Sequence, residues 1–340
     1  MPEFPRSICI VMLTAVGDAV HVLPVVTAIK RHSPGTRITW ILQPGPATLV
    51  RGHPDVDEVL VFERKLGWRA YAKLREQLRG RRFDVALAMQ PYFKAGLITA
   101  MVDAPRKIGF DRPRSRDLTW IFANERLEPR GERHFQDQYL EFAEALGVDP
   151  QPLTWNLGPW PAEQPLREAF VAKLAKPAAS IVIATSKPEK DWPAERWAEV
   201  CDALDAEFGL QPVLVGGTSP RELAAQETIL ARTTSTPLST LGAPLRELVS
   251  ILDASALVLS PDTGPLHMAV ALNRPTIALM GYTNPKRVGP YRRFQDLVID
   301  AYGDPGETYE VSRVNRPGRV QRITVEQVVE KIREWKTRYA

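Results

Sequence analysis

Short apolar runs alternate with amphipathic stretches along most of the chain. Four runs in the first half are typical of buried strands: Ile8–Leu13, Arg37–Leu42, Glu58–Phe62 and Phe83–Met89. Stretches of helical composition follow the turn after Leu13 to about Arg31, and occur at about Trp68–Leu78, near Gly96–Val102 and at His134–Leu146. This alternation predicts a parallel sheet covered by helices on both faces.

The second half repeats the pattern. We expect strands at Ser180–Thr185, Gln211–Val215, Ala256–Ser260 and Thr276–Met280. Helices are expected from Pro193 to about Phe208, from Ser219-Pro220 onward, at Leu245–Leu252 and at Leu266–Leu272. Thr324 is the expected cap of a charged terminal helix from Val325 to about Arg338. The fold class predicted is therefore α/β, with two sheets of similar construction.

Proline separates the two halves. Asp149-Pro150-Gln151-Pro152 and Gly158-Pro159-Trp160-Pro161 contain too much proline for an element interior and indicate a connector. A chain of 340 residues also suits two ordinary domains better than one. We predict a first domain at residues 1–155, a linker at 156–175, a second domain at 176–320 and a C-terminal helix at 321–340. Ligands would lie in a cleft between the carboxyl edges of the two sheets.

Composition narrows the class of partner. The hydrophobic content of 44% and charged content of 25% are those of a globular protein, and a net charge of +4 does not indicate a general polyanion or nucleic-acid binder. The basic residues are nevertheless uneven. Eight fall within 64–82 and five within 106–116. Such runs fit a solvated helix face, or alternatively a surface for anionic lipid or phosphate groups.

The N-terminus and the cysteines point to a cytoplasmic protein. Cys9 and Cys201 lie far apart, each within an apolar pattern, and are expected to be reduced core residues. The N-terminal apolar run is interrupted at Asp18, so neither a cleavable signal nor a membrane span is expected. Any contact with a membrane would then be made from its surface.

Asp18 follows the first predicted strand in the turn Thr14-Ala15-Val16-Gly17-Asp18. The glycines here do not form Gly-x-Gly-x-x-Gly, and no Gly-x-x-x-x-Gly-Lys-Ser/Thr loop occurs in the chain, so neither NAD binding nor P-loop chemistry is favoured. As an N-cap, Asp18 would place Pro24 at the sixth helical position, where a hydrogen bond is lost. We therefore expect the helix to start later or to kink, with Asp18 exposed in the turn at the ligand-binding edge.

The stretch Ser260–His267 is predicted to be a strand that opens into the start of a helix. Pro265 suits a first helical turn because it needs no donor there, so free N–H groups next to Thr263 and Gly264 can receive an anion. Taken alone, Asp262 or Thr263 fits an ordinary helix cap. His267, one turn inside the helix, fits either a packing residue or a ligand contact.

A third polar segment runs from Thr185 to Pro193. Thr185, Ser186, Lys187 and Lys190 supply two hydroxyls and two ammonium groups at a strand exit, which a diphosphate requires. A lone carboxylate on an opposite wall, such as Asp18, is what an attacking hydroxyl requires as its base. Lys190 also fits a surface lysine, and Glu222 fits a first-turn carboxylate that balances a helix dipole. No cysteine or histidine spacing predicts a metal site.

Several motifs in this order resemble the heptosyltransferase family, glycosyltransferase family 9. They are Val16–Pro24 (VGDAVHVLP), Lys187–Pro193 (KPEKDWP), Gly216-Gly217 with Glu222, Asp262–His267 (DTGPLH) and Gly281–Pro285 (GYTNP). The likeness covers nearly the whole chain, and its first and last motifs are fairly specific. It implies a GT-B fold with an N-terminal acceptor domain and a C-terminal nucleotide-sugar domain. The implied reaction is a metal-independent, inverting transfer of heptose from ADP-heptose to the lipopolysaccharide inner core.

The resemblance also implies residue roles. Asp18 would be the catalytic base, and Lys190 would stabilise the departing diphosphate. Substrate contacts are implied for Thr185, Ser186 and Lys190 (diphosphate), Glu222 (ribose), Gly242 within Leu241–Ala243 (adenine), and Asp262, Thr263 and Gly264 (sugar and phosphate), with His267 beside them. No cofactor or metal is expected. The partners would be a nucleotide sugar and an anionic glycolipid of the lipid A-Kdo type, with peripheral contact at the inner face of the inner membrane.

Some features leave alternatives open. Tyr282 stands where the family more often has proline, and the segment 303–318 carries no motif that assigns it a role. Another GT-B enzyme, transferring a different sugar or epimerising a nucleotide sugar, would use the same edge of the sheets. A non-catalytic two-domain protein that closes on a small anion would explain the expected cleft without reactivity at Asp18. The donor epimer, the heptose position and the oligomeric state are not specified by any of these motifs.

Overall fold

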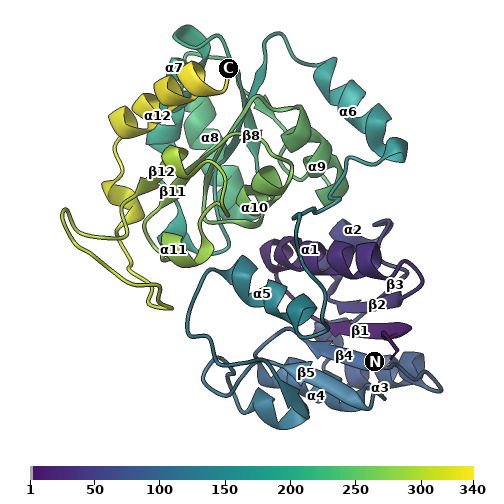
Figure 1. Cartoon of the computed structure of the whole chain (residues 1–340). Coiled ribbons are helices and arrows are strands. Elements are labelled where there is room, and N and C mark those ends of the chain that lie inside the picture. Colours follow the sequence, from purple (N-terminus) through teal and green to yellow (C-terminus); the bar gives the residue numbers. More distant parts are fainter. Residues whose placement is uncertain (1–2) are drawn as a thin grey trace. The chain divides into compact units, whose positions relative to one another are not determined.

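A computed structural model describes residues 3–340, which divide into two compact units, Met1–Asn156 and Leu157–Ala340. Each unit contains one six-stranded parallel sheet covered by helices on both faces (Figure 1). The predicted α/β class with two Rossmann-like sheets is confirmed.

The first unit has the strand order β3-β2-β1-β4-β5-β6. Its strands are β1 (Ser7–Val11), β2 (Arg37–Leu42), β3 (Glu58–Val61), β4 (Val85–Ala88), β5 (Arg106–Gly109) and β6 (Glu125–Arg126). Its helices are α1 (Val16–His32), α2 (Pro44–Val50), α3 (Trp68–Leu78), α4 (Phe93–Met101) and α5 (Phe135–Glu144), with 3-10 turns η1 (Arg64–Leu66) and η2 (Thr119–Phe122).

Alternate residues of β1 build the two layers of the first core. Cys9 and Val11 pack with Leu74 of α3 and Ile98 of α4 on one face of the sheet. Successive side chains of a strand point to opposite faces, so Ile8 and Ile10, both fully buried, serve the layer of α1 and α5. Burial on both faces explains why this strand is apolar throughout rather than alternating.

The second unit has the strand order β12-β11-β10-β7-β8-β9. Its strands are β7 (Ala178–Val182), β8 (Gln211–Val215), β9 (Leu238–Ser239), β10 (Leu257–Pro261), β11 (Thr276–Met280) and β12 (Val298–Asp300). Its helices are α6 (Gln164–Val171), α7 (Ala194–Ala206), α8 (Pro220–Arg232), α9 (Leu245–Ala254), α10 (Gly264–Ala271), α11 (Pro285–Val288) and α12 (Val325–Arg338), with 3-10 turns η3 (Pro161–Glu163), η4 (Pro188–Lys190), η5 (Gln295–Leu297) and η6 (Val320–Arg322).

The terminal helix belongs to the core of the second unit. Ile332 and Trp335 of α12 pack with Trp197 of α7 and with the apolar side chains of the sheet. The indole N–H of Trp192 donates to the carbonyl of Ile323, at 3.0 Å. Thr324 caps α12 by accepting from the Gln327 N–H, which confirms the expected start of that helix.

The segment 156–175, expected to be a linker, contains η3 and α6. Helix α6 packs against α9, and Glu163 forms a two-pronged ion pair with Arg246 of α9, at 2.6 and 2.5 Å. The guanidinium of Arg246 also donates to the carbonyl of Leu157, at 3.0 Å. These contacts hold the segment on the second unit.

The two sheets share one topology. Numbered within its own unit, each follows the order 3-2-1-4-5-6, with a reversal between its first and fourth strands. The reversal lies between β1 and β4 in the first unit and between β7 and β10 in the second. Ligands of open α/β sheets bind outside the carboxyl ends of strands at such a point. The loops that follow β1, β4, β7 and β10 are therefore the expected ligand-binding positions.

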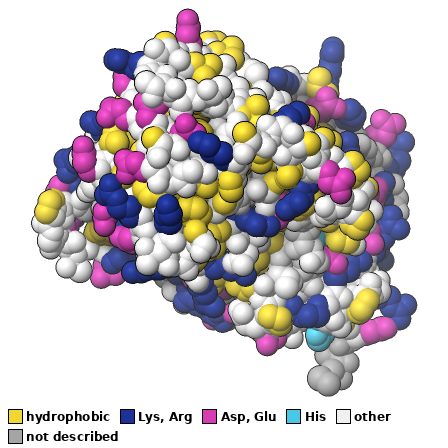
Figure 2. Space-filling view, turned by 90° about the horizontal axis from the view of Figure 1, so that it is seen from above, with side chains coloured by type: hydrophobic (Ala, Val, Ile, Leu, Met, Phe, Trp, Pro, Cys, Tyr) yellow, Lys and Arg dark blue, Asp and Glu magenta, His cyan; other side chains and the backbone are white. Residues whose placement is uncertain are grey.

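Surface charge and helix length add two findings. Among residues 3–340, no helix is both long enough and apolar enough to cross a membrane. On the face shown in Figure 2, Lys and Arg side chains are interspersed with Asp and Glu, which fits the small net charge.

Cys9 and Cys201 are both buried, as expected, and burial raises the pKa of each thiol.

Candidate functional site

An ion pair joins the two strand exits at the reversal point of the second unit. Lys190, which ends η4 beyond β7, lies 2.5 Å from Oδ2 of Asp262, the residue after β10. Thr283 donates to the same oxygen, at 2.6 Å. His267 places its Nε2 3.6 Å from Oδ1. The structure therefore brings together three of the predicted site residues, Lys190, Asp262 and His267.

The surroundings of Asp262 keep it ionised. Its side chain is 12% exposed and that of Lys190 is 15% exposed. Burial alone would raise the pKa of Asp262, but the hydrogen bond with His267 and the charge of Lys190 outweigh it and lower that pKa below its ordinary value. A fixed carboxylate thus anchors an ammonium group at the start of α10, leaving other donors of that group able to bind an anion.

Thr263 acts as the N-cap of α10. Its hydroxyl accepts from the Leu266 N–H at 3.4 Å and lies 2.8 Å from the hydroxyl of Ser260. The cap interpretation of the motif is therefore confirmed for Thr263, whereas Asp262 pairs with Lys190. Gly264 and Pro265 form the first turn of the helix. The positive end of this helix dipole adds to the charge of Lys190.

Thr185 is held inside a tight turn. Its N–H donates to Oδ1 of Asp191 at 2.7 Å, and its hydroxyl donates to the Lys187 carbonyl at 2.6 Å. Ser186 beside it is exposed. Burial raises the pKa of Asp191, although its hydrogen bonds with Thr185 oppose this shift. The turn therefore depends on a carboxylate that the sequence motif alone did not assign a role.

Arg221 is a cation that sequence reasoning missed. Its Nε lies 2.8 Å from Oδ2 of Asp191, and its NH2 group donates to the Thr185 carbonyl. It is the second residue of α8, so it comes from the next βα loop rather than from the Lys187–Pro193 motif. The signal that could have found it is its position beside Glu222, at a helix start that follows a strand.

Glu222 is the third residue of α8 and forms a capping box with Ser219. Oε1 accepts from the Gly217 N–H at 2.6 Å, and Oε2 accepts from the N–H and hydroxyl of Ser219 at 2.9 and 2.6 Å. Burial would raise the pKa of Glu222, but these bonds lower it overall. The first-turn structural interpretation is confirmed, and a ribose contact by Glu222 stays a prediction.

Gly242 lies in the loop next to Glu222. Its N–H donates to the Gly216 carbonyl at 2.9 Å, and its φ of +80° favours glycine. A Cβ at Gly217 would stand 2.8 Å from Oε2 of Glu222, so that carboxylate approaches the backbone closely. The structure thus brings the predicted ribose and adenine segments together at the exits of β8 and β9.

Tyr282, at the position where the family more often has proline, faces two ammonium groups. The Nζ atoms of Lys187 and Lys190 lie 5.6 and 5.9 Å from its ring centroid. Cations at this range are attracted to the face of an aromatic ring. The substitution therefore adds an aromatic wall beside Lys190.

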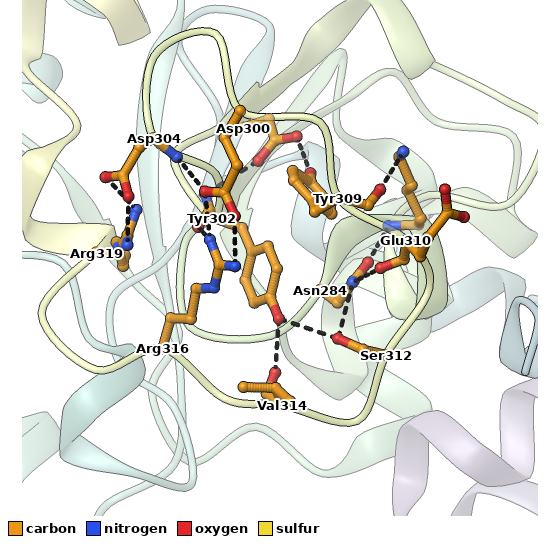
Figure 3. Close-up of polar contacts among 12 residues, drawn as sticks. Asn284, Asp300, Tyr302, Asp304, Tyr309, Glu310, Ser312, Val314, Arg316 and Arg319 are labelled. Carbon is orange, nitrogen blue, oxygen red and sulfur yellow. Dashed lines mark hydrogen bonds and ion pairs between the residues drawn. The ribbon is translucent and has the colours of Figure 1, made fainter.

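The segment 303–318, which has no recognisable motif, braces the loop that carries Tyr282 and Thr283. The Arg316 N–H donates to the Tyr282 carbonyl at 2.8 Å. Asn284, which is buried, donates to the Glu310 carbonyl at 2.8 Å and to the Ser312 hydroxyl at 3.3 Å. Figure 3 shows the contacts of Asn284 with Glu310 and Ser312. Thr283 is thereby held where it can donate to Asp262.

Side chains of the same segment and of its two neighbours, Tyr302 and Arg319, contact each other. The Tyr302 hydroxyl donates to the Val314 carbonyl at 3.0 Å, and the Arg316 guanidinium donates to the Tyr302 carbonyl at 2.9 Å while pairing with Glu307 (Figure 3). Arg319 pairs with Asp304 at 2.6 Å. These partners are up to fifteen residues apart and follow no repeat, which explains why no sequence pattern indicated them.

Asp18 lies on the first unit, in the first turn of α1. Of the two expected alternatives, a later helix start is excluded because α1 begins at Val16 and includes Pro24, while a kink stays a prediction. The expectation that Asp18 lies exposed in the preceding turn is wrong, because Asp18 belongs to the helix and is only partly exposed. Oδ2 of Asp18 accepts from the Ala15 N–H at 2.8 Å, so the carboxylate binds one of the free donors at the helix start. Asp18 is half-buried at the carboxyl end of β1, which was the expected edge.

Gln90, from the exit of β4, fixes the exit of β1. Its Oε1 accepts from the Leu13 N–H at 3.0 Å, and its Nε2 donates to the Thr14 carbonyl at 2.9 Å. The reversal point of the first unit is therefore bridged by a neutral amide, immediately before Asp18. Gln90 follows the predicted strand Phe83–Met89, and no sequence motif assigned it a role.

His21, one turn after Asp18 on α1, contacts Gln136 of α5. Its Nδ1 lies 3.0 Å from Oε1 of Gln136, and Nε2 of Gln136 donates to the His21 carbonyl at 2.7 Å. These contacts tie α1 to α5. Among residues 3–340, no group of three or more His, Cys, Asp or Glu side chains is arranged to hold a metal ion.

Many solved structures share this fold. The structure of a glycosyltransferase family 9 protein from Veillonella parvula aligns over 98% of both chains, with a TM-score of 0.83 and 22% identity. That of the Escherichia coli heptosyltransferase WaaC, solved with ADP, aligns over 96% of this chain and 99% of its own, with a TM-score of 0.78 and 25% identity. The architecture is thus that of the GT-B glycosyltransferases.

Sequence comparison is more specific. Residues 71–313 match glycosyltransferase family 9 (heptosyltransferase). The lipopolysaccharide core heptosyltransferase OpsX of Haemophilus influenzae is 33% identical over 297 residues, covering 87% of this chain and 85% of that protein. The chain belongs to glycosyltransferase family 9, and it is a glycosyltransferase.

Proposed function

We propose that the protein transfers a heptose from ADP-heptose to the inner core of lipopolysaccharide, with inversion at the anomeric carbon. The single observation that carries the proposal is the set of polar groups at the reversal point of the second unit, where Lys190 and the start of α10 face the same edge. The sequence match of this chain with a lipopolysaccharide core heptosyltransferase supports lipopolysaccharide as the acceptor. Its structural likeness to a heptosyltransferase solved with ADP supports an ADP-linked donor.

In this proposal the second unit binds the donor. The Lys190 ammonium and the free N–H groups at Gly264 stabilise the charge that gathers on the departing diphosphate. Ser186 and the turn of Thr185 contact the same diphosphate. Asp262 and His267 bind sugar hydroxyls, while Glu222 and the backbone at Gly242 bind the ribose and adenine. No metal is assigned a part in this scheme.

The first unit supplies the base. Asp18 takes the proton from the acceptor hydroxyl as that oxygen forms a bond to the anomeric carbon, while the bond to the ADP oxygen breaks. ADP leaves from the opposite side of the sugar, which inverts the configuration in one displacement. The acceptor is an anionic glycolipid of the lipid A-Kdo type, met at the inner face of the inner membrane.

Release of ADP from ADP-heptose, with heptose-deficient lipopolysaccharide as acceptor, tests the proposal. We expect Asp18→Asn, which keeps an acceptor for the Ala15 N–H, to lower kcat by about 10²–10⁴-fold, because a positioned base contributes that much. Binding of ADP should not change. Chelation of divalent metals should leave the rate unaltered.

The control is Glu326→Gln, which removes an exposed first-turn carboxylate from α12. It should retain the wild-type rate. Full turnover by Asp18→Asn would refute the assignment of the base. If the wild-type enzyme released no ADP with any core acceptor but released another nucleotide from another donor, the heptose assignment would be wrong while the class of reaction would stand.

A further inference from the structure

The exposed large hydrophobic side chains of residues 3–156 fall in three segments. Leu66 and Trp68 lie in the first, Tyr92 and Phe93 in the second, and Leu118 and Ile121 in the third. Trp68 is 81% exposed, Leu118 60% and Ile121 52%. Scattered apolar residues need no explanation, but their confinement to three short segments does.

The fold gathers these segments at one end of the first unit. Each follows a parallel strand of the same sheet, namely β3, β4 and β5, so all three leave its carboxyl edge. Helices α3 and α4, which begin at Trp68 and Phe93, cover the same face of the sheet (Figure 1). Helices α3 and α4 contact each other, and both begin at that carboxyl edge.

The third segment is attached to the second. The Arg116 N–H donates to the Pro91 carbonyl at 3.1 Å, and the ring of Phe93 meets that of Phe122 at 5.7 Å in an edge-to-face contact. A Cβ at Gly96 of α4 would collide with the Phe122 ring, at 2.3 Å. Leu118 and Ile121 are therefore presented next to the start of α4. We call residues 64–69, 92–94 and 112–121 together the aromatic–basic surface.

Cations surround these apolar groups. The aromatic–basic surface carries exposed Arg64, Lys65, Arg69, Lys94, Arg112 and Arg116, and the exposed acid within it is Asp117. Arg112 lies 4.8 Å above the Trp120 ring, and Arg116 lies 5.9 Å from the Tyr92 ring. The face shown in Figure 2, by contrast, mixes cations with anions. The charge imbalance is therefore local.

We propose that the aromatic–basic surface docks on an anionic lipid bilayer. Trp and Tyr rings with neighbouring Arg and Lys side chains suit the headgroup level of a membrane, where an apolar body and a cationic tip are both satisfied. A second copy of the chain is a poorer occupant, because a two-fold contact would bring six cations against six. This inference rests on the proposed function, since an acceptor anchored in lipid requires the enzyme to work at a membrane.

Sedimentation of the full chain with vesicles tests the docking surface. We expect binding to phosphatidylcholine vesicles that contain phosphatidylglycerol, weakening with added salt, and little binding to phosphatidylcholine alone. The double variant Trp68→Ser/Leu118→Ser should bind about tenfold or more weakly, because two largely exposed apolar side chains no longer insert. The triple variant Arg64→Gln/Lys65→Gln/Arg112→Gln should lose most of the dependence on phosphatidylglycerol.

Two matched controls fix the location. Leu223→Ser/Leu230→Ser removes two exposed leucines from α8 of the second unit, and Arg75→Gln/Arg79→Gln removes exposed cations from the last turn of α3 and its C-cap. Both should bind vesicles like wild type. Equal losses in the controls, or no binding by wild type at low salt, would overturn the proposal. So would a change of oligomeric state in Trp68→Ser/Leu118→Ser without a change in vesicle binding, which would make the surface an interface between protein copies.

Two acceptors separate this inference from the proposed function. Trp68→Ser/Leu118→Ser should transfer to a deacylated, water-soluble core acceptor at the wild-type rate but should be slower with the same acceptor embedded in vesicles. Normal transfer from ADP-heptose without vesicle binding would refute the docking surface alone. Vesicle binding without transfer to either acceptor would refute the proposed reaction alone.

Discussion

The reversal points of the two sheets share a topology and differ in chemistry. In the first unit a neutral amide, Gln90, bridges the two strand exits, and the carboxylate of Asp18 stands beyond it. In the second unit a charged pair, Lys190 and Asp262, bridges the equivalent exits. The same backbone arrangement therefore presents a single carboxylate on one unit and an ion pair on the other. The fold supplies the position, and a few side chains supply the function.

The largest expected effect comes from breaking the charged bridge. Asp262→Ala would leave the Lys190 ammonium group largely buried and without its carboxylate partner. It would then lie beside the start of α10, whose partial charge is also positive. Loss of one partner of such a pair destabilises by about 3–5 kcal/mol, because the remaining charge is uncompensated. Urea unfolding of wild type, Asp262→Ala and the double variant Lys190→Met/Asp262→Leu measures the loss in the free energy of unfolding. The double variant should regain much of the loss, and equal destabilisation of both would contradict the ion-pair explanation.

The same pair should make stability depend on pH in acid. The folded state lowers the pKa of Asp262, so its contribution is present above the unfolded pKa of about 3.9 and is lost as pH falls below it. Wild-type protein should therefore lose stability in that range more steeply than Asp262→Asn. Parallel pH profiles for the two proteins would show that this carboxyl is not the group concerned.

A smaller effect is expected from breaking the neutral bridge. Gln90→Met would leave the buried Leu13 N–H without its acceptor, which destabilises by about 1–3 kcal/mol. Gln90→Glu is the matched control because it keeps an acceptor oxygen for Leu13. In thermal unfolding, Gln90→Met should have a lower Tm than Gln90→Glu. A result in the opposite order would contradict the role given to the Leu13 contact.

The smallest effect concerns two capping boxes of one design. Glu222→Ala in α8 and Gln327→Ala in α12 each remove the reciprocal bond to the N-cap backbone, and each should destabilise by about 1 kcal/mol. Only Glu222→Ala should also weaken ADP binding in calorimetry, if Glu222 contacts the ribose. Unchanged ADP affinity would leave Glu222 with its capping role alone.

Sequence reasoning succeeded where the signal is local. The exit motifs at Asp18, Lys190 and Asp262 were placed correctly at strand ends, because a buried strand followed by small and polar residues is readable over a dozen positions. The later start that was one alternative for α1 was wrong, because the proline rule treats a helix in isolation. In the folded unit, α1 is almost wholly buried from Ala19 to Ile29, and that burial outweighs the bond lost at Pro24.

Contacts between distant segments were out of reach. Arg114, counted among surface cations, is 2% exposed and pairs with Asp111 and Glu141, at 2.7 and 2.8 Å. Glu141 lies on a different element, so neither its pairing nor its burial could be inferred from the basic run. Burial raises the pKa of Glu141 even though Arg114 opposes the shift. The brace of residues 303–318 escaped for the same reason, since its partners lie in the Tyr282–Asn284 loop.

The bond from Trp192 to Ile323 has a consequence for the order of folding. Trp192 and Ile323 stand 131 residues apart, and Ile332 and Trp335 complete the same core. During synthesis, every residue that the first sheet requires has emerged before the second sheet begins. The second unit, in contrast, must hold Trp192 and Trp197 without their final partners until residues 323–335 have been synthesised, so these side chains remain accessible to chaperones and proteases for longer.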